Sequence, residues 1–287
     1  MANKSNLLKQ ILQEVNEMPP LPAVVLKVIQ MTKDPNVSAS ELNKIISMDQ
    51  SLTANILKLC NSAYYGLPRV ISSVTQAIMY LGFHTVRNLV MTTTLHDIYD
   101  SETEGYGYGK GGLWRHSIAC ALGSQILCKK YRPGLNDTAF TAGLLHDVGK
   151  LLINKFSSNT YDSLVEVSHN NNLSLVEAEQ ELFGCDHAEV GAKVADTWNF
   201  PQELVQAIGF HHAPDKSQGK QLLTILVHIA NVASQDSRIS LIENPIVEEI
   251  SDFAAKTINF SNAEMEDLII NLEQAMKDAE NFLNIGK

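Results

Sequence analysis

The chain has 287 residues, of which 45% are hydrophobic and 19% are charged, so it carries enough apolar material for one large core or two modest ones. This composition excludes an intrinsically disordered chain, a collagen and a coiled coil. The formal net charge is −10, and all of it falls in residues 113–287. Such an acidic part argues against sequence-independent binding of nucleic acid, because that binding needs Lys and Arg to neutralise phosphates.

The amino terminus and the apolar runs predict a cytoplasmic protein without a membrane partner. The first ten residues, MANKSNLLKQ, lack the apolar stretch and cleavage site of a signal peptide. No apolar run reaches the roughly 20 residues that a membrane helix needs. The cysteines form no CxxC pair, so we expect buried thiols rather than disulfides or a thiolate zinc site. They are Cys60, Cys120, Cys128 and Cys185.

Apolar residues recur at helical spacing along the chain and predict an all-α fold. The first stripe covers residues 8–15, and the next, residues 24–29, follows a proline-rich break at 19–22. Capping boxes, in which a Ser is followed three residues later by a Glu, predict helix starts at Ser38, Ser174 and Ser261. We find no alternating strand pattern and no internal repeat.

A glycine-rich segment, SETEGYGYGKGG at residues 101–112, predicts a flexible connector, because its five glycines remove the backbone restriction that a helix needs. It would separate an N-terminal helical subdomain, residues 1–100, from a C-terminal one, residues 113–287. A surface loop between two helices of one body is an equally good interpretation. Seven of the nine histidines follow this segment.

Metal-ligand side chains occur in separate predicted segments after the connector. They are His116, His146, Asp147, His187, His211 and His212. Imidazole nitrogen together with carboxylate oxygen suits one or two divalent transition metal ions: iron, manganese, zinc or nickel. Because His146 and Asp147 are adjacent, both reach one site only if it lies at the end or side of their helix. Lys150, one turn beyond His146, could contact a phosphate oxygen or a carboxylate.

Each of these residues also has an ordinary structural interpretation. A lone His such as His116 or His187 is commonly a hydrogen-bonded packing residue. The His211-His212 pair precedes Ala213-Pro214, so it could mark a helix end where imidazoles favour the negative end of the dipole. The predicted helix over residues 261–282 has an apolar face that could pack internally or bind a partner helix.

The chain resembles the HDOD domain family over roughly residues 15–235. The motifs that carry this resemblance are Met18-Pro19-Pro20-Leu21-Pro22, Asp49-Gln50-Ser51-Leu52, Asn61-Ser62-Ala63-Tyr64-Tyr65-Gly66, Ile71, Ala77-Ile78 and Leu81-Gly82. The order of the histidines is similar to that of the HD superfamily of metal-dependent phosphohydrolases. It is closest to the branch that hydrolyses cyclic di-GMP, in which the His-Asp pair is followed by Gly-Lys, as in Gly149-Lys150.

The resemblance implies an all-helical bacterial signalling module of two subdomains, the C-terminal one HD-like, that is usually non-catalytic and acts by contacts with signalling proteins. By position, His116, His146 and Asp147 would hold one ion. Asp147 would bridge to a second ion, held by His187, His211 and His212. If the module were catalytic, it would be a metal-dependent phosphodiesterase or phosphatase acting on a phosphate-containing ligand such as a cyclic dinucleotide, with Asp147 and Lys150 in catalytic roles.

Two departures from the catalytic branch argue against hydrolysis. That branch has an aspartate where Asn231 stands, and a neutral amide is a weaker ligand that cannot offset the charge of an ion. It also has a Gly-Tyr-Pro loop after the His-His pair, where this chain runs Ala213-Pro214-Asp215-Lys216. The sequence therefore predicts a signalling module with a regulatory or vestigial metal site. A phosphohydrolase, and a sensor that responds to iron redox state or to a small ligand, are the alternatives.

Overall fold

The structure is a computed structural model that describes residues 2–18, 20–100, 106–108, 110–156, 160–219, 221–236, 238–240 and 248–285. Every element in these residues is a helix, and they contain no strand. The predicted all-α fold is therefore confirmed. None of the described helices is long and apolar enough to cross a bilayer.

The chain divides into two compact units. The first comprises Met1–Pro20 and Tyr99–Glu273, and the second comprises Leu21–Ile98 and Gln274–Lys287. The predicted division, with its connector at residues 101–112, assigns residues 1–100 to one subdomain and residues 113–287 to the other. In the structure, Met1–Pro20 belongs to the unit that contains most of the C-terminal half, and Gln274–Lys287 belongs to the unit that contains most of the N-terminal half. Of that connector, residues 101–105 and 109 lie outside the described residues, whereas Tyr106 and Tyr108 are described and buried.

The second unit is built from short helices joined by tight turns. They are α2 (Ala23–Met31), α3 (Ala39–Ile46), α4 (Gln50–Cys60), most of α5 (Val74–Asp100), the end of α15 (Asn262–Asp278), and α16 (Glu280–Leu283). The predicted capping box at Ser38 is present, because Ser38 Oγ accepts a hydrogen bond from the backbone N–H of Glu41 and the Glu41 carboxylate accepts one in return. This satisfies two amides at the start of α3.

The Asn-Ser-Ala-Tyr-Tyr-Gly stretch forms the turn after α4. Asn61 ties the turn together: its amide nitrogen donates to the carbonyls of Leu57 and Ile71, both at 2.8 Å, and its amide oxygen accepts from Ile71 N at 2.7 Å. The rings of Tyr64 and Tyr65 lie 5.7 Å and 6.2 Å from the ring of Phe282 in α16. The motif therefore holds the C-terminal helix within its own unit.

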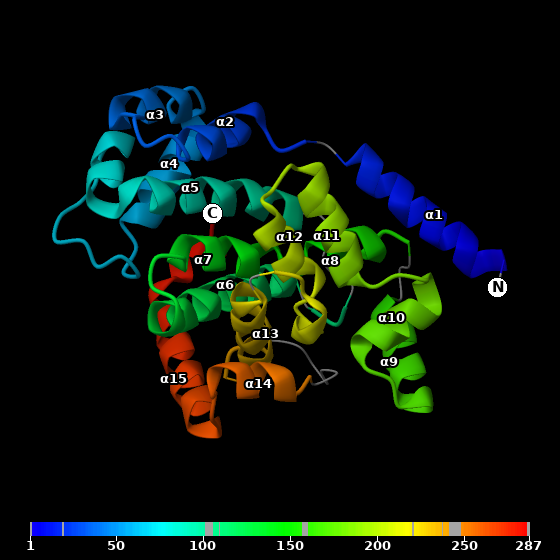
Figure 1. Ribbon diagram of the computed structural model, residues 1–287. Coiled ribbons are helices and arrows are strands. Elements are labelled where there is room, and N and C mark those ends of the chain that lie inside the picture. The colour runs from blue at the N-terminus through cyan, green and yellow to red at the C-terminus, as the bar shows by residue number, and fades with distance from the viewer. Residues whose placement is uncertain are drawn as a thin grey trace. The chain divides into compact units, whose positions relative to one another are not determined.

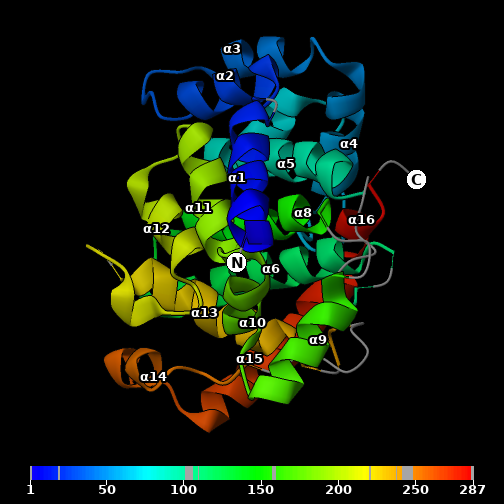
Figure 2. The ribbon, with the colours of Figure 1, turned by 90° about the vertical axis from the view of Figure 1, so that its right-hand side faces the viewer.

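The first unit is centred on α6 (Gly112–Tyr131), a helix buried on most of its faces. It packs against α7 (Asn136–Leu145) and α13 (Leu222–Ser234) (Figure 1). Beside this group, α11 (His187–Thr197) packs against α8 (Val148–Asn154) and α12 (Gln202–Gly209) (Figure 2). The remaining elements are α1 (Ala2–Glu17), α9 (Thr160–Asn171), α10 (Leu175–Phe183), η1 (Pro214–Lys216), α14 (Asp252–Ile258) and most of α15.

Two glycines let the segment that contains His146 and Asp147 approach its neighbours at backbone distance. A Cβ at Gly143 in α7 would lie 2.6 Å from the carbonyl oxygen of Cys120 in α6. A Cβ at Gly149 in α8 would lie only 2.0 Å from the carbonyl oxygen of His187. Only glycine fits at such contacts. The His146-Asp147 pair is thereby held between α6 and the start of α11.

Most predicted element boundaries agree with the structure. Helices α10 and α15 follow the predicted capping boxes, and all four cysteines are free and buried as expected. The interpretation in which the His211-His212 pair marks a helix end places that end too late, because α12 ends at Gly209. The predicted helix at 261–282 is divided into α15 and α16, and its apolar face is a packing stripe in which Leu268, Ile269, Leu272 and Met276 are buried.

Candidate metal centre

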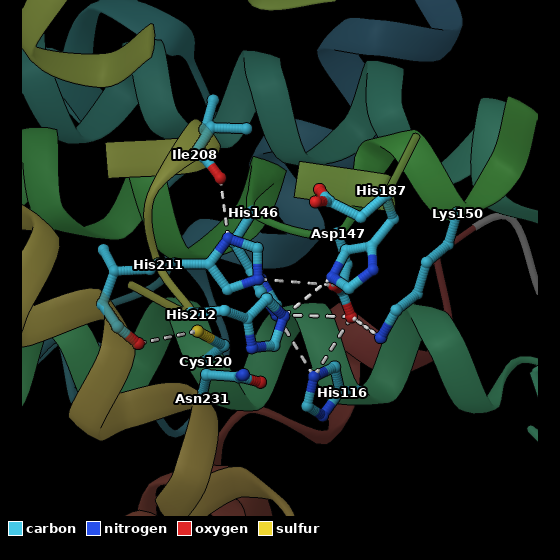
Figure 3. A network of polar contacts seen from close by, with 12 residues as sticks. His116, Cys120, His146, Asp147, Lys150, His187, Ile208, His211, His212 and Asn231 are labelled. Carbon is cyan, nitrogen blue, oxygen red and sulfur yellow. Dashed lines mark hydrogen bonds and ion pairs between the residues drawn. The ribbon is translucent and has the colours of Figure 1, made fainter. Parts of the chain in front are cut away.

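All six predicted ligand residues come together within the first unit (Figure 3). His116 projects from α6, His146 and Asp147 occupy the junction of α7 and α8, and His187 is the first residue of α11, where Asp186 caps the helix. His211 and His212 follow the end of α12. Their ligand atoms form two sets, each within 4.8 Å: the His116 group (His116, His146, Asp147) and the His187 group (His187, His211, His212).

The Asp147 carboxylate lies between the two groups. Its Oδ2 is 3.3 Å from Nε2 of both His116 and His146. Its Oδ1 faces the other way, 3.2 Å from His187 Nε2 and 3.8 Å from His211 Nε2. One carboxylate therefore presents an oxygen to each group, which is the arrangement that a bridging ligand requires.

Every histidine of the two groups is anchored through Nδ1 on the far side of its ring. His146 and His211 donate to the carbonyl oxygens of Gly143 and Ile208, both at 2.7 Å. The other three bind side chains: His187 binds Glu179 at 2.7 Å, His212 binds Glu248 at 2.8 Å, and His116 binds Ser234 at 3.1 Å. Ser234 donates its own hydrogen to the Asn231 carbonyl, so its oxygen accepts from His116.

This anchoring fixes the tautomers. With the proton on Nδ1, a neutral imidazole directs the lone pair of Nε2 inward, as in most histidine metal ligands. The inward nitrogens face each other at 3.2 Å between His116 and His146 and at 2.9 Å between His187 and His212. His211 Nε2 and Asp147 Oδ1 are buried without a hydrogen-bond partner.

These distances fit a metal ion. Two ligand atoms that each lie about 2.1 Å from one ion and subtend a right angle are separated by about 3.0 Å. The facing nitrogens are close to that value, and a proton on His146 or His187 makes each pair an N–H···N hydrogen bond when no ion is bound. The donor set of imidazoles and one carboxylate is also one that transition metals prefer. The described residues therefore fit the predicted cofactor, while its identity and the ligand roles of these residues stay predictions.

Burial keeps three of the histidines neutral, and a neutral imidazole can donate a lone pair to a metal ion. Burial lowers the pKa of His116 to about 4 and holds the pKa of His211 and His212 well below the usual range. Burial raises the pKa of Asp147, but nearby His146 and Lys150 outweigh it and hold the pKa well below its usual range. Asp147 is therefore an ionised carboxylate at neutral pH.

The other two histidines bind protons strongly when no ion competes. Burial lowers the pKa of His187, but the Glu179 carboxylate outweighs it and raises the pKa to about 9. For His146, the Asp147 carboxylate likewise outweighs burial and raises the pKa well above its usual range. An ion that binds here would have to displace these protons.

Lys150 contacts the candidate ligand carboxylate directly. Its Nζ lies 2.7 Å from Asp147 Oδ2, and the side chain is buried. The rings of Tyr106 and Tyr108 lie 5.5 Å and 5.6 Å from the ammonium, within cation–π range. Tyr106 has a left-handed backbone, with φ of 66°, that a following glycine at 107 continues. Two residues of the predicted connector thus cover Lys150.

Asn231, the weaker candidate ligand, lies beside the cluster on α13 (Figure 3). Its amide nitrogen donates to Glu248 Oε2 at 3.1 Å, and its amide oxygen is buried without a hydrogen-bond partner. The side chain therefore brings an amide oxygen, and no charge, to the site.

Sequence reasoning missed the groups that anchor the ligands. Glu179 is fully buried on α10, and its carboxylate accepts from both Nδ1 and the backbone N–H of His187. An acidic residue between the buried Ala178 and Phe183 was the available signal. Glu248 is not part of a described helix and offers no such pattern. His228 is a positioning residue, because it donates to the His211 carbonyl and accepts from Ser251 N.

Comparisons with known proteins agree with this architecture. A family model described as the HDOD domain matches residues 18–214, which is more than half of the chain. A protein of Treponema pallidum (strain Nichols), described only as uncharacterized, is 25% identical over 213 residues. The match covers 72% of this chain and 40% of that protein, so this chain spans less than half of the relative's length.

Several solved structures share the fold. An HDOD domain protein of unknown function from Geobacter sulfurreducens has a TM-score of 0.77 at 24% identity, with 97% of this chain and 98% of that chain covered. A protein from Marinobacter aquaeolei VT8, provisionally named a signal transduction protein, has a TM-score of 0.76 at 21% identity, covering 94% and 60%. One from Shewanella amazonensis SB2B, provisionally named a metal-dependent phosphohydrolase, has a TM-score of 0.66 at 20% identity, covering 97% and 99%.

Proposed function

The chain belongs to the HDOD domain family, and from this premise we propose that it is a signalling module that acts by contacts with partner proteins and contains a regulatory transition-metal site. One observation carries the metal part of the proposal. Five histidines are each anchored through Nδ1, and four of them direct Nε2 to within 3.8 Å of the Asp147 carboxylate. The name of the Marinobacter aquaeolei structure supports the signalling part.

The closure of the site favours a regulatory role over a catalytic one. The side chains of His146, Asp147, His187 and His211 have no exposed surface. Lys150, the residue best suited to contact a phosphate, is paired with Asp147 and covered by Tyr106 and Tyr108. A phosphoester would have to displace these contacts before it reached the ligands.

The test is metal-dependent capture of a partner. Immobilised protein, loaded with metal or treated with a chelator, is exposed to extract from the source cells. We expect one partner to bind the loaded form and to be lost after His187→Ala, which removes a ligand. His169→Ala changes an exposed histidine on α9 and is the matched control, which should retain the partner. Equal capture by the loaded, chelated and His187→Ala proteins would contradict a regulatory metal site.

A metal-dependent phosphohydrolase is the second candidate, favoured by the position of Asp147 between the two groups and by the nearby Lys150 ammonium. Divalent ions supply such enzymes with water activation and with neutralisation of phosphate charge. Here Lys150 would hold positive charge beside the phosphate. Asp147 would fix the position of the His116 group relative to the His187 group. The name of the Shewanella amazonensis structure supports this candidate.

Hydrolysis is tested with metal-loaded protein and three substrates: a cyclic dinucleotide, a nucleoside monophosphate and bis(p-nitrophenyl) phosphate. Turnover that disappears after Asp147→Ala, while His169→Ala remains active, would establish the enzyme. Turnover that survives Asp147→Ala would come from a contaminant, and a lack of turnover in the fully loaded protein would exclude this candidate.

A further inference from the structure

The two ligand groups are unequal. Resting on the proposed metal binding, we infer that the centre holds one divalent ion, in the His187 group with Asp147 Oδ1, and that the Lys150 ammonium supplies the second positive charge at Asp147 Oδ2.

The two oxygens of Asp147 have different neighbours. Oδ2, which faces the His116 group, already accepts a hydrogen bond from the Lys150 ammonium at 2.7 Å. Oδ1, which faces the His187 group, is buried and has no hydrogen-bond partner. A cation in the His187 group would satisfy Oδ1, whereas a cation in the His116 group would share Oδ2 with an ammonium of like charge.

The groups behind the ligands favour the same side. In the His187 group, two of the three imidazoles are backed by carboxylates, Glu179 and Glu248. In the His116 group, the two imidazoles are backed by the Gly143 carbonyl and the Ser234 hydroxyl, which carry no net charge. A carboxylate behind an imidazole makes it a stronger donor toward a cation.

Charge balance limits the centre to one ion. Three carboxylates, Asp147, Glu179 and Glu248, and one ammonium, Lys150, are in contact with one another or with the histidines among the described residues. With neutral imidazoles they leave at most two negative charges, which one divalent ion is enough to neutralise. A second ion would leave at least two uncompensated positive charges in a buried site, at a high electrostatic cost.

Asn231 lies where the site could have had a further negative charge. Its neutral amide donates to Glu248 instead of adding a carboxylate. This explains how the chain can keep the ligands of the His116 group and still disfavour an ion there. It also provides a substitution that should restore the second ion.

The test uses Co²⁺ alone as the probe. Metal-free protein is titrated with Co²⁺ while the visible absorption is followed, and bound metal is measured by elemental analysis after gel filtration. We expect saturation at about one ion per chain. His187→Ala should lose tight binding, whereas His116→Ala should retain about one ion. Circular dichroism verifies that both variants are folded.

Two further variants test the reason for the limit. Asn231→Asp adds a carboxylate, and Lys150→Met removes the competing ammonium. Each variant should raise the number of bound metal ions per chain toward two, and the double variant should reach two. His169→Ala should leave the content at one. Two tightly bound ions in the unchanged protein, or loss of the single ion in His116→Ala with retention in His187→Ala, would overturn the inference. No binding at all would instead refute the proposed metal site.

Discussion

Glu179 is the clearest example of a side chain whose role depends on one partner. It is fully buried, and its Oε2 accepts two hydrogen bonds from His187, at 2.9 Å from the backbone N–H and at 2.7 Å from Nδ1. In the metal-free protein this carboxylate stabilises the protonated imidazole. The pair therefore couples folding stability to pH.

We predict that the metal-free protein loses stability as the pH rises from about 6.5 to about 9. The folded-state pKa of His187, about 9, is raised above its ordinary value of 6.5. Its contribution is therefore fully present below pH 6.5 and is lost as the pH rises through 9. The loss should be on the order of 3 kcal/mol, measured as the free energy of urea unfolding in the presence of a chelator.

Glu179→Gln is the control, because it keeps the shape of the side chain and removes the charge that raises the His187 pKa. This variant should be less stable than the unchanged protein at pH 6.5, and the difference should shrink by pH 9. If both proteins showed the same pH dependence, the His187–Glu179 pair would not be its source.

For individual residues, the sequence predicted which ligand-type side chains lie close together. It did not predict the side chains that anchor the histidines through Nδ1. The histidines and Asp147 could be recognised by residue type and order, since few other residues bind transition metals. Glu179 and Glu248 act through hydrogen bonds to particular ring nitrogens, and nothing in a sequence gives those distances. Tyr106 and Tyr108 were missed because the glycines around them predict a solvent-exposed connector.

Helix α8 can approach α11 only because Gly149 has no side chain. We predict that Gly149→Ala lowers the free energy of unfolding by several kcal/mol and abolishes tight metal binding. A Cβ at 2.0 Å from the His187 carbonyl oxygen would push α8 away from α11 and separate Asp147 from His187. The clash outweighs the gain of about 1 kcal/mol in helix propensity. Urea unfolding and Co²⁺ titration measure the two effects.

Gly123→Ala is the matched control in α6. Its Cβ would lie 3.2 Å from the Cβ of Ala230, a contact that a shift of a few tenths of an ångström relieves. This variant should be far less destabilised than Gly149→Ala and should keep its metal. Equal stability of the two variants would show that close approach at Gly149 is not required.

Helix starts were more predictable than helix ends. Ser38, Ser174 and Ser261 begin helices as expected, because a capping box is a local pattern of side chain and backbone. The end of α12 at Gly209 was placed too late because Ala213-Pro214 forms the next turn rather than the stop. Ends depend more on tertiary packing, which a local pattern does not contain.

For the molecule as a whole, we predict that removal of metal lowers thermal stability. An ion that binds only the folded state adds about 4 kcal/mol when its free concentration is a thousand times the dissociation constant. The midpoint of thermal unfolding should therefore fall on chelation and recover when the metal is restored. His187→Ala should show no response to either step. An identical response of that variant and the unchanged protein would place the metal elsewhere.

The net charge of the protein predicts weak interaction with nucleic acid. With a net charge of −10, the protein should not bind a random DNA duplex at physiological salt. Fluorescence anisotropy of labelled duplex in 150 mM salt checks this, with a basic protein as positive control. Micromolar binding there would contradict the prediction.

The anchored ligands come from segments that are far apart in the chain. His116 and His146 are separated by 30 residues, and His187 and His212 by 25. An ion that joined such segments would act like a covalent cross-link, since it would close loops whose freedom the unfolded chain otherwise keeps. Its ligands meet only after those loops have closed, so the ion would chiefly slow unfolding rather than speed folding. Metal supply would then set the lifetime of the native chain.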